Sequence, residues 1–351
     1  MTTEILKIRT LDESRKADLE RAAKIIRQGG LVIFPTETVY GLGADATNTS
    51  AVSAIYEAKG RPSDNPLIIH IADPRDAEKY TYTNELYYTL AKAFMPGPIT
   101  VILKSRDIIP SRTRGGLDTV AVRCPKNEIA RNLISSAGTP IAAPSANLSG
   151  SPSPTVAEHV IDDMLGRVDM IIDGGDADFG LESTIVKIED DFSLTLLRPG
   201  KITFDDLKKI TPNVSVASAV TDKLAEGEKV LSPGMKYRHY APKAPVILLD
   251  GETNDIIDYI RSSNENNVAA LIYTEEKAVF KSALPTVDTY DFGSEKREEE
   301  QAHRLFSILR EADKKNYSVI YAPLPSQDGI GLALYNRMIR AAAHKIIRLR
   351  R

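Results

Sequence analysis

The sequence contains one cysteine, no long apolar run and no strong excess of charge, and each absence excludes a class of protein. With Cys124 alone, neither an internal disulfide nor a cysteine metal cluster can form, and this usage is typical of a reducing cytoplasm. Residues 1–20 lack the apolar core of a signal peptide, and no run of about 18 apolar residues follows. We therefore expect a cytoplasmic protein.

The net charge also argues against a dedicated nucleic-acid binder. The chain has 45 basic and 48 acidic residues, which gives a formal charge of −3. A protein that binds nucleic acid over a broad surface usually carries a strongly positive field. Any anion site in this protein must therefore be local.

The common nucleotide and hydrolase motifs are missing as well. The sequence contains no G-x-x-x-x-G-K-[ST] phosphate loop, no G-x-G-x-x-G after a strand, no H-E-x-x-H and no G-x-S-x-G. A nucleotide site in this chain must be of another kind.

The length of 351 residues favours two domains, and the apolar pattern supports this division. A helix is predicted over residues 14–28, with Gly29 and Gly30 as its stop. Short β-branched runs then predict strands, with few helices between the later ones, which favours a mixed sheet. These runs lie at residues 31–36, 66–71, 99–105, 119–125, 140–147, 170–175, 183–188 and 194–200.

The second domain has a different order of predicted strands and helices. Apolar runs alternate here with polar or helical segments, as in a parallel α/β unit, and the runs are VILLD, NVAALIY, VDTYDFG and YSVIYAPLP. The segment LALYNRMIRAAAHKII predicts a last helix, which packs on the sheet through residues that include Ile346 and Ile347. The boundaries we expect are a first domain over residues 1–212, a linker over 213–244 that contains SPGMKYRHYAP, and a second domain over 245–351.

Polar side chains gather where the apolar runs of the first domain begin or end. Such convergence often makes the binding crevice of an α/β protein. The residues are Thr36, Thr38, Lys59, Arg61, Ser63, Asn65, Arg123, Ser145, Asn147, Ser149 and Ser153.

Each of these features also has an ordinary structural interpretation. A Lys-x-Arg pair is typical of a solvated loop, and a serine- and asparagine-rich loop is typical of turns. His70, inside an apolar run, is more typical of a core histidine than of a ligand. Arg123 ends an apolar strand, where a guanidinium needs an anionic partner, and the residues leave open whether that partner is a ligand or a protein group.

Taken together and in this order, the motifs resemble those of the YrdC/Sua5 family, in its longer two-domain form. The resemblance covers nearly the whole chain. The motifs are PTETVYGLG, KGRPSDNPL, FMPGPITVIL, VAVRCP, APSANLSG, ESTIV, LLRPG and SPGMKYRHYAP. It implies a YrdC-like domain with a twisted mixed α/β sheet, followed by a smaller, Rossmann-like parallel α/β domain.

The resemblance also implies an activity. Members of this family are nucleotidyltransferases that join L-threonine, bicarbonate and ATP into L-threonylcarbamoyladenylate and release pyrophosphate. A tRNA threonylcarbamoyl transferase complex then uses this product to make threonylcarbamoyladenosine at position 37 of tRNA.

By the same resemblance, the site residues divide between the two substrates. Lys59 and Arg61 would be catalytic, by neutralising the triphosphate and the developing charge. The threonine-binding residues would be Thr36, His70, Arg123, Ala143 and Ser183. The ATP-binding residues would be Lys59, Ser63, Thr119, Ser145, Asn147, Ser153, Arg198 and Tyr237.

We expect no protein ligands for a metal, because no acidic residues stand at ligand spacing, and Asp173, Asp176 and Asp178 follow or flank glycine turns. Mg²⁺ would arrive with ATP. The SPGMKYRHYAP segment, with its cations and tyrosines, is interpreted as a lid that closes over the phosphates and excludes water.

Two other classes of function remain open from the sequence. A cationic concavity in the first domain could bind double-stranded RNA, or make a weak contact with tRNA, although the near-neutral charge counts against this. The chain could also be a regulatory protein that binds a nucleotide or an amino acid without turnover. Release of pyrophosphate separates this last class from the enzyme.

Overall fold

The computed structural model describes residues 2–222, 232, 240–263 and 265–349. These residues divide into two compact units. The first contains residues 2–149, 153–222 and 232, and the second contains residues 150–152 and those from 240 onward. The domain boundaries expected from the sequence stay a prediction. Residues 213–216, placed in the linker by that prediction, form β11 (Asn213–Val216), which pairs with β10 (Ser193–Arg198) in the sheet of the first unit.

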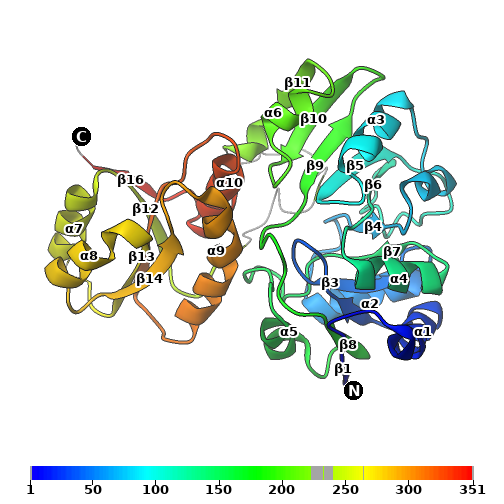
Figure 1. The fold of residues 1–351 in the computed structure, drawn as a ribbon, viewed down its shortest axis with the longest axis horizontal. Coiled ribbons are helices and arrows are strands. Elements are labelled where there is room, and N and C mark those ends of the chain that lie inside the picture. Colours follow the sequence, from blue (N-terminus) through cyan, green and yellow to red (C-terminus); the bar gives the residue numbers. More distant parts are fainter. Residues whose placement is uncertain (1, 223–231, 233–239, 264, 350–351) are drawn as a thin grey trace. The chain divides into compact units, whose positions relative to one another are not determined.

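The first unit is built on one twisted mixed sheet of 11 strands, in the order β1-β8-β2-β3-β7-β4-β6-β5-β9-β10-β11 (Figure 1). All eight strands predicted for this unit are confirmed, and each is shorter than predicted, although β10 begins one residue earlier, at Ser193. The strands are β1 (Glu4–Lys7), β2 (Val32–Phe34), β3 (Gly41–Asp45), β4 (Ile68–His70), β5 (Ile99–Lys104), β6 (Thr119–Arg123), β7 (Ile141–Ala142), β8 (Met170–Asp173), β9 (Thr184–Ile188), β10 and β11.

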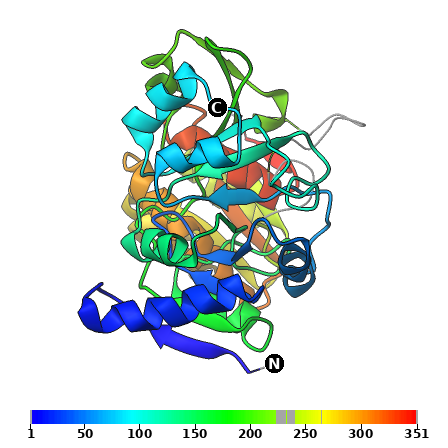
Figure 2. The ribbon, with the colours of Figure 1, turned by 90° about the vertical axis from the view of Figure 1, so that its right-hand side faces the viewer.

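Helices cover this sheet. They are α1 (Glu13–Arg27), α2 (Thr49–Lys59), α3 (Glu85–Phe94), α4 (Glu128–Ala137), α5 (Ala157–Met164) and α6 (Phe204–Lys208). Helices α1 and α4 lie side by side and pack on β1, β2 and β8 through a shared apolar core (Figures 1 and 2).

The predicted first helix is confirmed within a residue at each end. Its side chains Leu19, Ala22 and Ala23 are buried at helical spacing, which is why this segment packs as a helix. The Asp12 carboxylate caps the start by accepting from the Arg15 amide at 3.2 Å, and Gly29, with φ of 84°, takes the left-handed conformation after the end.

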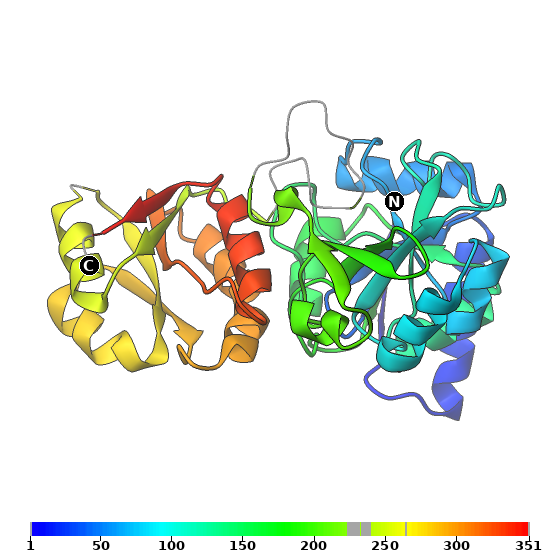
Figure 3. The same cartoon turned by 90° about the horizontal axis from the view of Figure 1, so that it is seen from above.

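The second unit is a five-stranded, all-parallel sheet in the order β14-β13-β15-β12-β16. Helices α7 and α8 lie on one face, and α9 and α10 lie on the other (Figure 3). The elements are β12 (Val246–Asp250), α7 (Thr253–Ser262), β13 (Val268–Tyr273), α8 (Lys277–Ala283), β14 (Asp288–Gly293), α9 (Glu298–Asp313), β15 (Val319–Pro323), α10 (Gly331–Ala341) and β16 (Ile346–Arg348).

The extent predicted for the last helix is wrong. The helix ends at Ala341, and Ala343 and His344 have φ values of 48° and 63°, which an α-helix does not allow. Ile346 and Ile347 therefore lie in strand β16, parallel to β12, and not on the helix. Among the described helices, none has the length and apolar character that a bilayer span needs.

Candidate functional site

Three of the predicted threonine-binding residues lie at or just after the carboxyl ends of strands β4, β6 and β2 of the first sheet. Strands β4 and β6 are parallel, and their last residues, His70 and Arg123, are partners in the sheet register. The Arg123 guanidinium lies 3.5 Å from the Thr36 hydroxyl, in the turn after β2. The Ala143 amide donates to the Ile68 carbonyl at 3.0 Å, which places that backbone beside the same strand.

The turn after β2 is held by its own hydroxyl group. Thr36 Oγ1 accepts from the amides of Thr38 and Val39, each at 3.2 Å, and donates to the Val39 carbonyl at 2.6 Å. A threonine in this role fixes a tight turn, because its side chain replaces a main-chain partner. The neighbouring Thr38 hydroxyl lies 2.9 Å from both Thr36 Oγ1 and the Arg123 guanidinium.

Arg123 is buried, with 4% of its surface exposed, and it already has an anionic neighbour in the protein. Its guanidinium lies 2.9 Å from a carboxylate oxygen of Glu37. Glu37 was not among the predicted site residues. An acidic residue between two threonines, directly after an apolar run, is the signal in the sequence that could have identified it.

His70 is neutral in this environment. It is 3% exposed and its ring packs edge-on against Phe34 at 6.1 Å. Burial, with a smaller contribution from the charge of Arg123, lowers the pKa of His70 to about 3. Its Nδ1 atom has no hydrogen-bond partner in the structure. At neutral pH it therefore offers an uncharged imidazole, and not a second cation, beside Arg123.

Lys59, which was predicted to bind ATP, is a buried cation. It is the last residue of α2, and Gly60, with φ of 60°, turns the chain after it. The Lys59 ammonium is 2% exposed and donates to the carbonyls of Ser145, at 2.6 Å, and Asn147. These two hydrogen bonds fix the direction in which the ammonium points.

The structure gives Arg61 a role in holding its own loop. Its guanidinium donates to the carbonyls of Asn65, at 3.4 Å, and Pro66, at 3.2 Å. Tyr56 donates to the same Asn65 carbonyl at 3.1 Å. The loop from 61 to 66 is thereby fixed against α2, and Ser63 lies exposed on it.

Two further pairs of predicted residues are in contact. The Ser145 hydroxyl donates to the Asn147 side-chain oxygen at 2.5 Å. Arg198, at the end of β10, donates to the carbonyl and hydroxyl of Ser183, at 3.0 and 3.2 Å, and that hydroxyl lies 2.8 Å from Thr100. Arg198 and Ser183 were predicted to serve different substrates, and the structure places them side by side.

The remaining ATP-side residues are dispersed. The Ser153 hydroxyl donates to Glu182, a buried carboxylate that the sequence interpretation did not select. Thr119 opens β6 and so lies about 13 Å along the strand from Arg123. In the sheet, Thr119 pairs with Lys104 of β5. Tyr237 and most of the predicted lid lie outside the described residues.

A protein site for a metal ion is not evident in the described residues, where no group of three or more histidine, cysteine or acidic side chains could hold an ion. Asp173, one of the acidic residues considered from the sequence, lies 2.9 Å from the Arg9 guanidinium and accepts from the Gly175 amide at 3.2 Å. These contacts stabilise the turn after β8.

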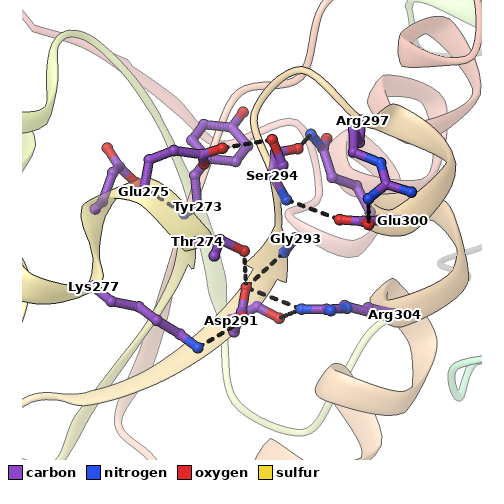
Figure 4. Close-up of polar contacts among 12 residues, drawn as sticks. Tyr273, Thr274, Glu275, Lys277, Asp291, Gly293, Ser294, Arg297, Glu300 and Arg304 are labelled. Carbon is purple, nitrogen blue, oxygen red and sulfur yellow. Dashed lines mark hydrogen bonds and ion pairs between the residues drawn. The ribbon is translucent and has the colours of Figure 1, made fainter.

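A second polar cluster, in the C-terminal unit, has a structural role (Figure 4). Asp291 of β14 lies 2.7 Å from the Lys277 ammonium and 3.0 Å from the Arg304 guanidinium, and it accepts from the Thr274 hydroxyl and the Gly293 amide. Burial by itself would raise the pKa of Asp291, but these partners hold it well below its usual range. The carboxylate thus joins β14 to α8 and α9.

Two family models match this chain. Residues 24–200 match the Sua5_yciO_yrdC family, described as telomere recombination, and residues 202–343 match the Sua5_C family, described as the C-terminal domain of threonylcarbamoyl-AMP synthase.

Two characterised relatives span nearly the whole chain. A threonylcarbamoyl-AMP synthase of Bacillus subtilis is 44% identical, over 94% of each protein, and one of Pyrococcus abyssi is 43% identical, over 93% of this chain and 95% of the relative. The crystal structure of P. abyssi Sua5 complexed with L-threonine superposes with a TM-score of 0.89 at 40% identity, covering 99% of this chain and all of that one.

Proposed function

Because the chain belongs to the two-domain Sua5/YrdC family of threonylcarbamoyl-AMP synthases, we propose that it makes L-threonylcarbamoyladenylate from L-threonine, bicarbonate and ATP. The observation that carries this proposal is the buried group formed by Arg123, His70 and Thr36 at the ends of β4, β6 and β2. A cation and hydroxyl groups in a buried crevice suit a small amino acid.

In this proposal Arg123 binds the threonine carboxylate, with Thr36, His70 and Ser183 around the rest of the amino acid and Ala143 contributing its backbone. A guanidinium binds a carboxylate through two parallel hydrogen bonds, which gives both strength and orientation. The neutral imidazole of His70 adds no competing charge.

The ATP side must neutralise charge. The nucleophile is the carbamate formed on the threonine nitrogen, and its oxygen attacks the α-phosphorus of ATP while the bond to the pyrophosphate oxygen breaks. Two unit negative charges at about 4 Å repel by about 4 kcal/mol at an effective dielectric near 20. Lys59 supplies the opposing charge, which makes the reaction a nucleotidyl transfer by alignment and charge neutralisation.

The other ATP-binding residues that we propose are Ser63, Thr119, Ser145, Asn147, Ser153, Arg198 and Tyr237. We propose that Lys59 and Arg61 are both catalytic and neutralise the charge of the triphosphate, and that Arg61 also holds the loop over residues 61–66. Mg²⁺ enters as part of the MgATP substrate. The segment over residues 232–242 closes over the phosphates and limits hydrolysis of the mixed anhydride.

We further propose that the enzyme works in the cytoplasm and that its product passes to a tRNA threonylcarbamoyl transferase complex. A mixed carboxylic–phosphoric anhydride is an activated acyl donor, so the reaction that consumes it must be an acyl transfer to a nucleophile.

Release of pyrophosphate tests this function. We expect release from ATP to require both threonine and bicarbonate, because the nucleophile contains atoms of both. The measurement is a coupled pyrophosphate assay on the intact chain, with each component omitted in turn. Equal release without threonine would contradict the proposed function, and so would the absence of release in the complete mixture.

A further inference from the structure

Glu37 is a buried carboxylate inside the candidate amino-acid site. It lies in the turn between Thr36 and Thr38, with 5% of its surface exposed, and its main-chain carbonyl accepts from the Phe179 amide at 3.0 Å. The turn is fixed by the Thr36 hydroxyl, so the carboxylate is presented by a rigid piece of backbone.

The ion pair between Glu37 and Arg123 leaves hydrogen-bonding capacity on both groups. The charges approach to 2.9 Å, yet among the residues that the structure describes neither carboxylate oxygen of Glu37 accepts a well-aligned hydrogen bond, and the buried Nε of Arg123 donates none. A buried carboxylate without donors is costly, and it is stabilised strongly by any N–H that reaches it. A pair built only to stabilise the core would be expected to use these atoms.

The chemistry of these two groups matches that of an α-amino acid. The substrate carries a carboxylate and an amino group on one carbon, so it needs a cation and an anion that lie close together. Arg123 and Glu37 provide this pairing. The protein pair and the zwitterion are each neutral overall, so binding leaves no charge uncompensated.

We propose that Glu37 accepts a hydrogen bond from the amino group of the threonine substrate and so selects α-amino acids over acids that lack the amine. This inference rests on the proposed function, because it assigns threonine to this pocket. The nitrogen keeps one N–H when it becomes a carbamate, so the same acceptor serves the substrate throughout the reaction.

Substitution of Glu37 by glutamine, measured against two ligands, tests this assignment. The ligands are L-threonine and 3-hydroxybutanoate, which keeps the carboxylate, the hydroxyl and the methyl group but lacks the amine. By calorimetry on the intact chain, the wild type is expected to bind threonine about 10- to 100-fold more tightly. In Glu37→Gln, which keeps the size but not the charge, that preference is expected to fall to about threefold or less.

The matched control is Glu182→Gln, which alters another buried glutamate in the first unit, hydrogen-bonded to Ser153. It is expected to leave the preference for threonine unchanged. A weakening of both ligands by the same factor in Glu37→Gln would overturn the proposal, because a residue that only positions Arg123 would act on the shared carboxylate.

If Glu37→Gln does not fold, the affinities of the wild type for threonine and 3-hydroxybutanoate still test the proposed role of Glu37. Equal affinity of the wild type for threonine and 3-hydroxybutanoate would overturn the role of Glu37. Pyrophosphate release is measured separately, so a wild type that makes the adenylate but shows no preference for the amine refutes this inference and leaves the proposed function intact.

Discussion

Replacing Arg123 by alanine is expected to raise the threonine concentration needed for half-maximal rate by at least about 30-fold, while the ATP requirement changes by less than about threefold. Removing one partner of a buried, hydrogen-bonded charge pair costs about 2–5 kcal/mol, and about 1.4 kcal/mol corresponds to a factor of ten. Steady-state kinetics with each substrate varied in turn measures both requirements.

Arg123→Ala also leaves Glu37 without its cation, which can lower the free energy of unfolding by several kcal/mol. The matched variant is therefore Arg123→Lys, which keeps the charge but loses the planar guanidinium. It is expected to stay folded in a thermal melt and still to show the selective loss of threonine use. A variant of either kind that impairs ATP and threonine equally would refute the division of the pocket.

Lys59→Met is expected to have the converse effect. Methionine keeps the length and the apolar stem of the side chain but removes the ammonium, so the phosphates lose a buried counter-charge. We expect the ATP requirement to rise at least about 30-fold, while threonine binding in the absence of ATP, measured by calorimetry, changes by less than about threefold.

The control for this variant is Lys104→Met, at the exposed end of β5, which is expected to leave both substrates unaffected. Because Lys59 also donates to the carbonyls of Ser145 and Asn147, a thermal melt of Lys59→Met checks that the variant is folded. An ATP requirement that rises less than about threefold in the folded variant would show that the charge of Lys59 is not what ATP requires.

The sequence predicted the strands whose apolar runs are long enough to be recognised, and it missed those that depend on tertiary contacts. Strand β3 contains Gly41 and Gly43, and glycines at this spacing are more typical of a turn than of a strand. A side chain at Gly43 would lie 2.7 Å from the Phe34 ring and 2.8 Å from Ile141, so glycine is needed for close packing there. Strand β16 was taken for helix because Ile346 and Ile347 continue a helical apolar spacing, and only the positive φ values before them end the helix.

In the candidate site, too, the sequence analysis missed contacts that depend on the tertiary fold. The end of an apolar run indicated Arg123 in the sequence, because polar groups at strand ends converge, whereas His70 entered the candidate site only through the family resemblance. Glu37 was missed because its ion pair with Arg123 joins residues 86 positions apart, and the one local signal, an acidic residue directly after an apolar run, does not indicate that partner. The assignment of Arg61 to phosphate stays a prediction, and its contacts with the Asn65 and Pro66 carbonyls depend on the shape of a loop that sequence spacing does not fix.

The most direct test of the central claim is mass-spectrometric detection of threonylcarbamoyl-AMP after the intact chain is incubated with ATP, Mg²⁺, bicarbonate and L-threonine. The account predicts an adduct that carries the mass label of both ¹³C-bicarbonate and ¹⁵N-threonine and that is absent when either is omitted. Pyrophosphate release without this doubly labelled adenylate would contradict it.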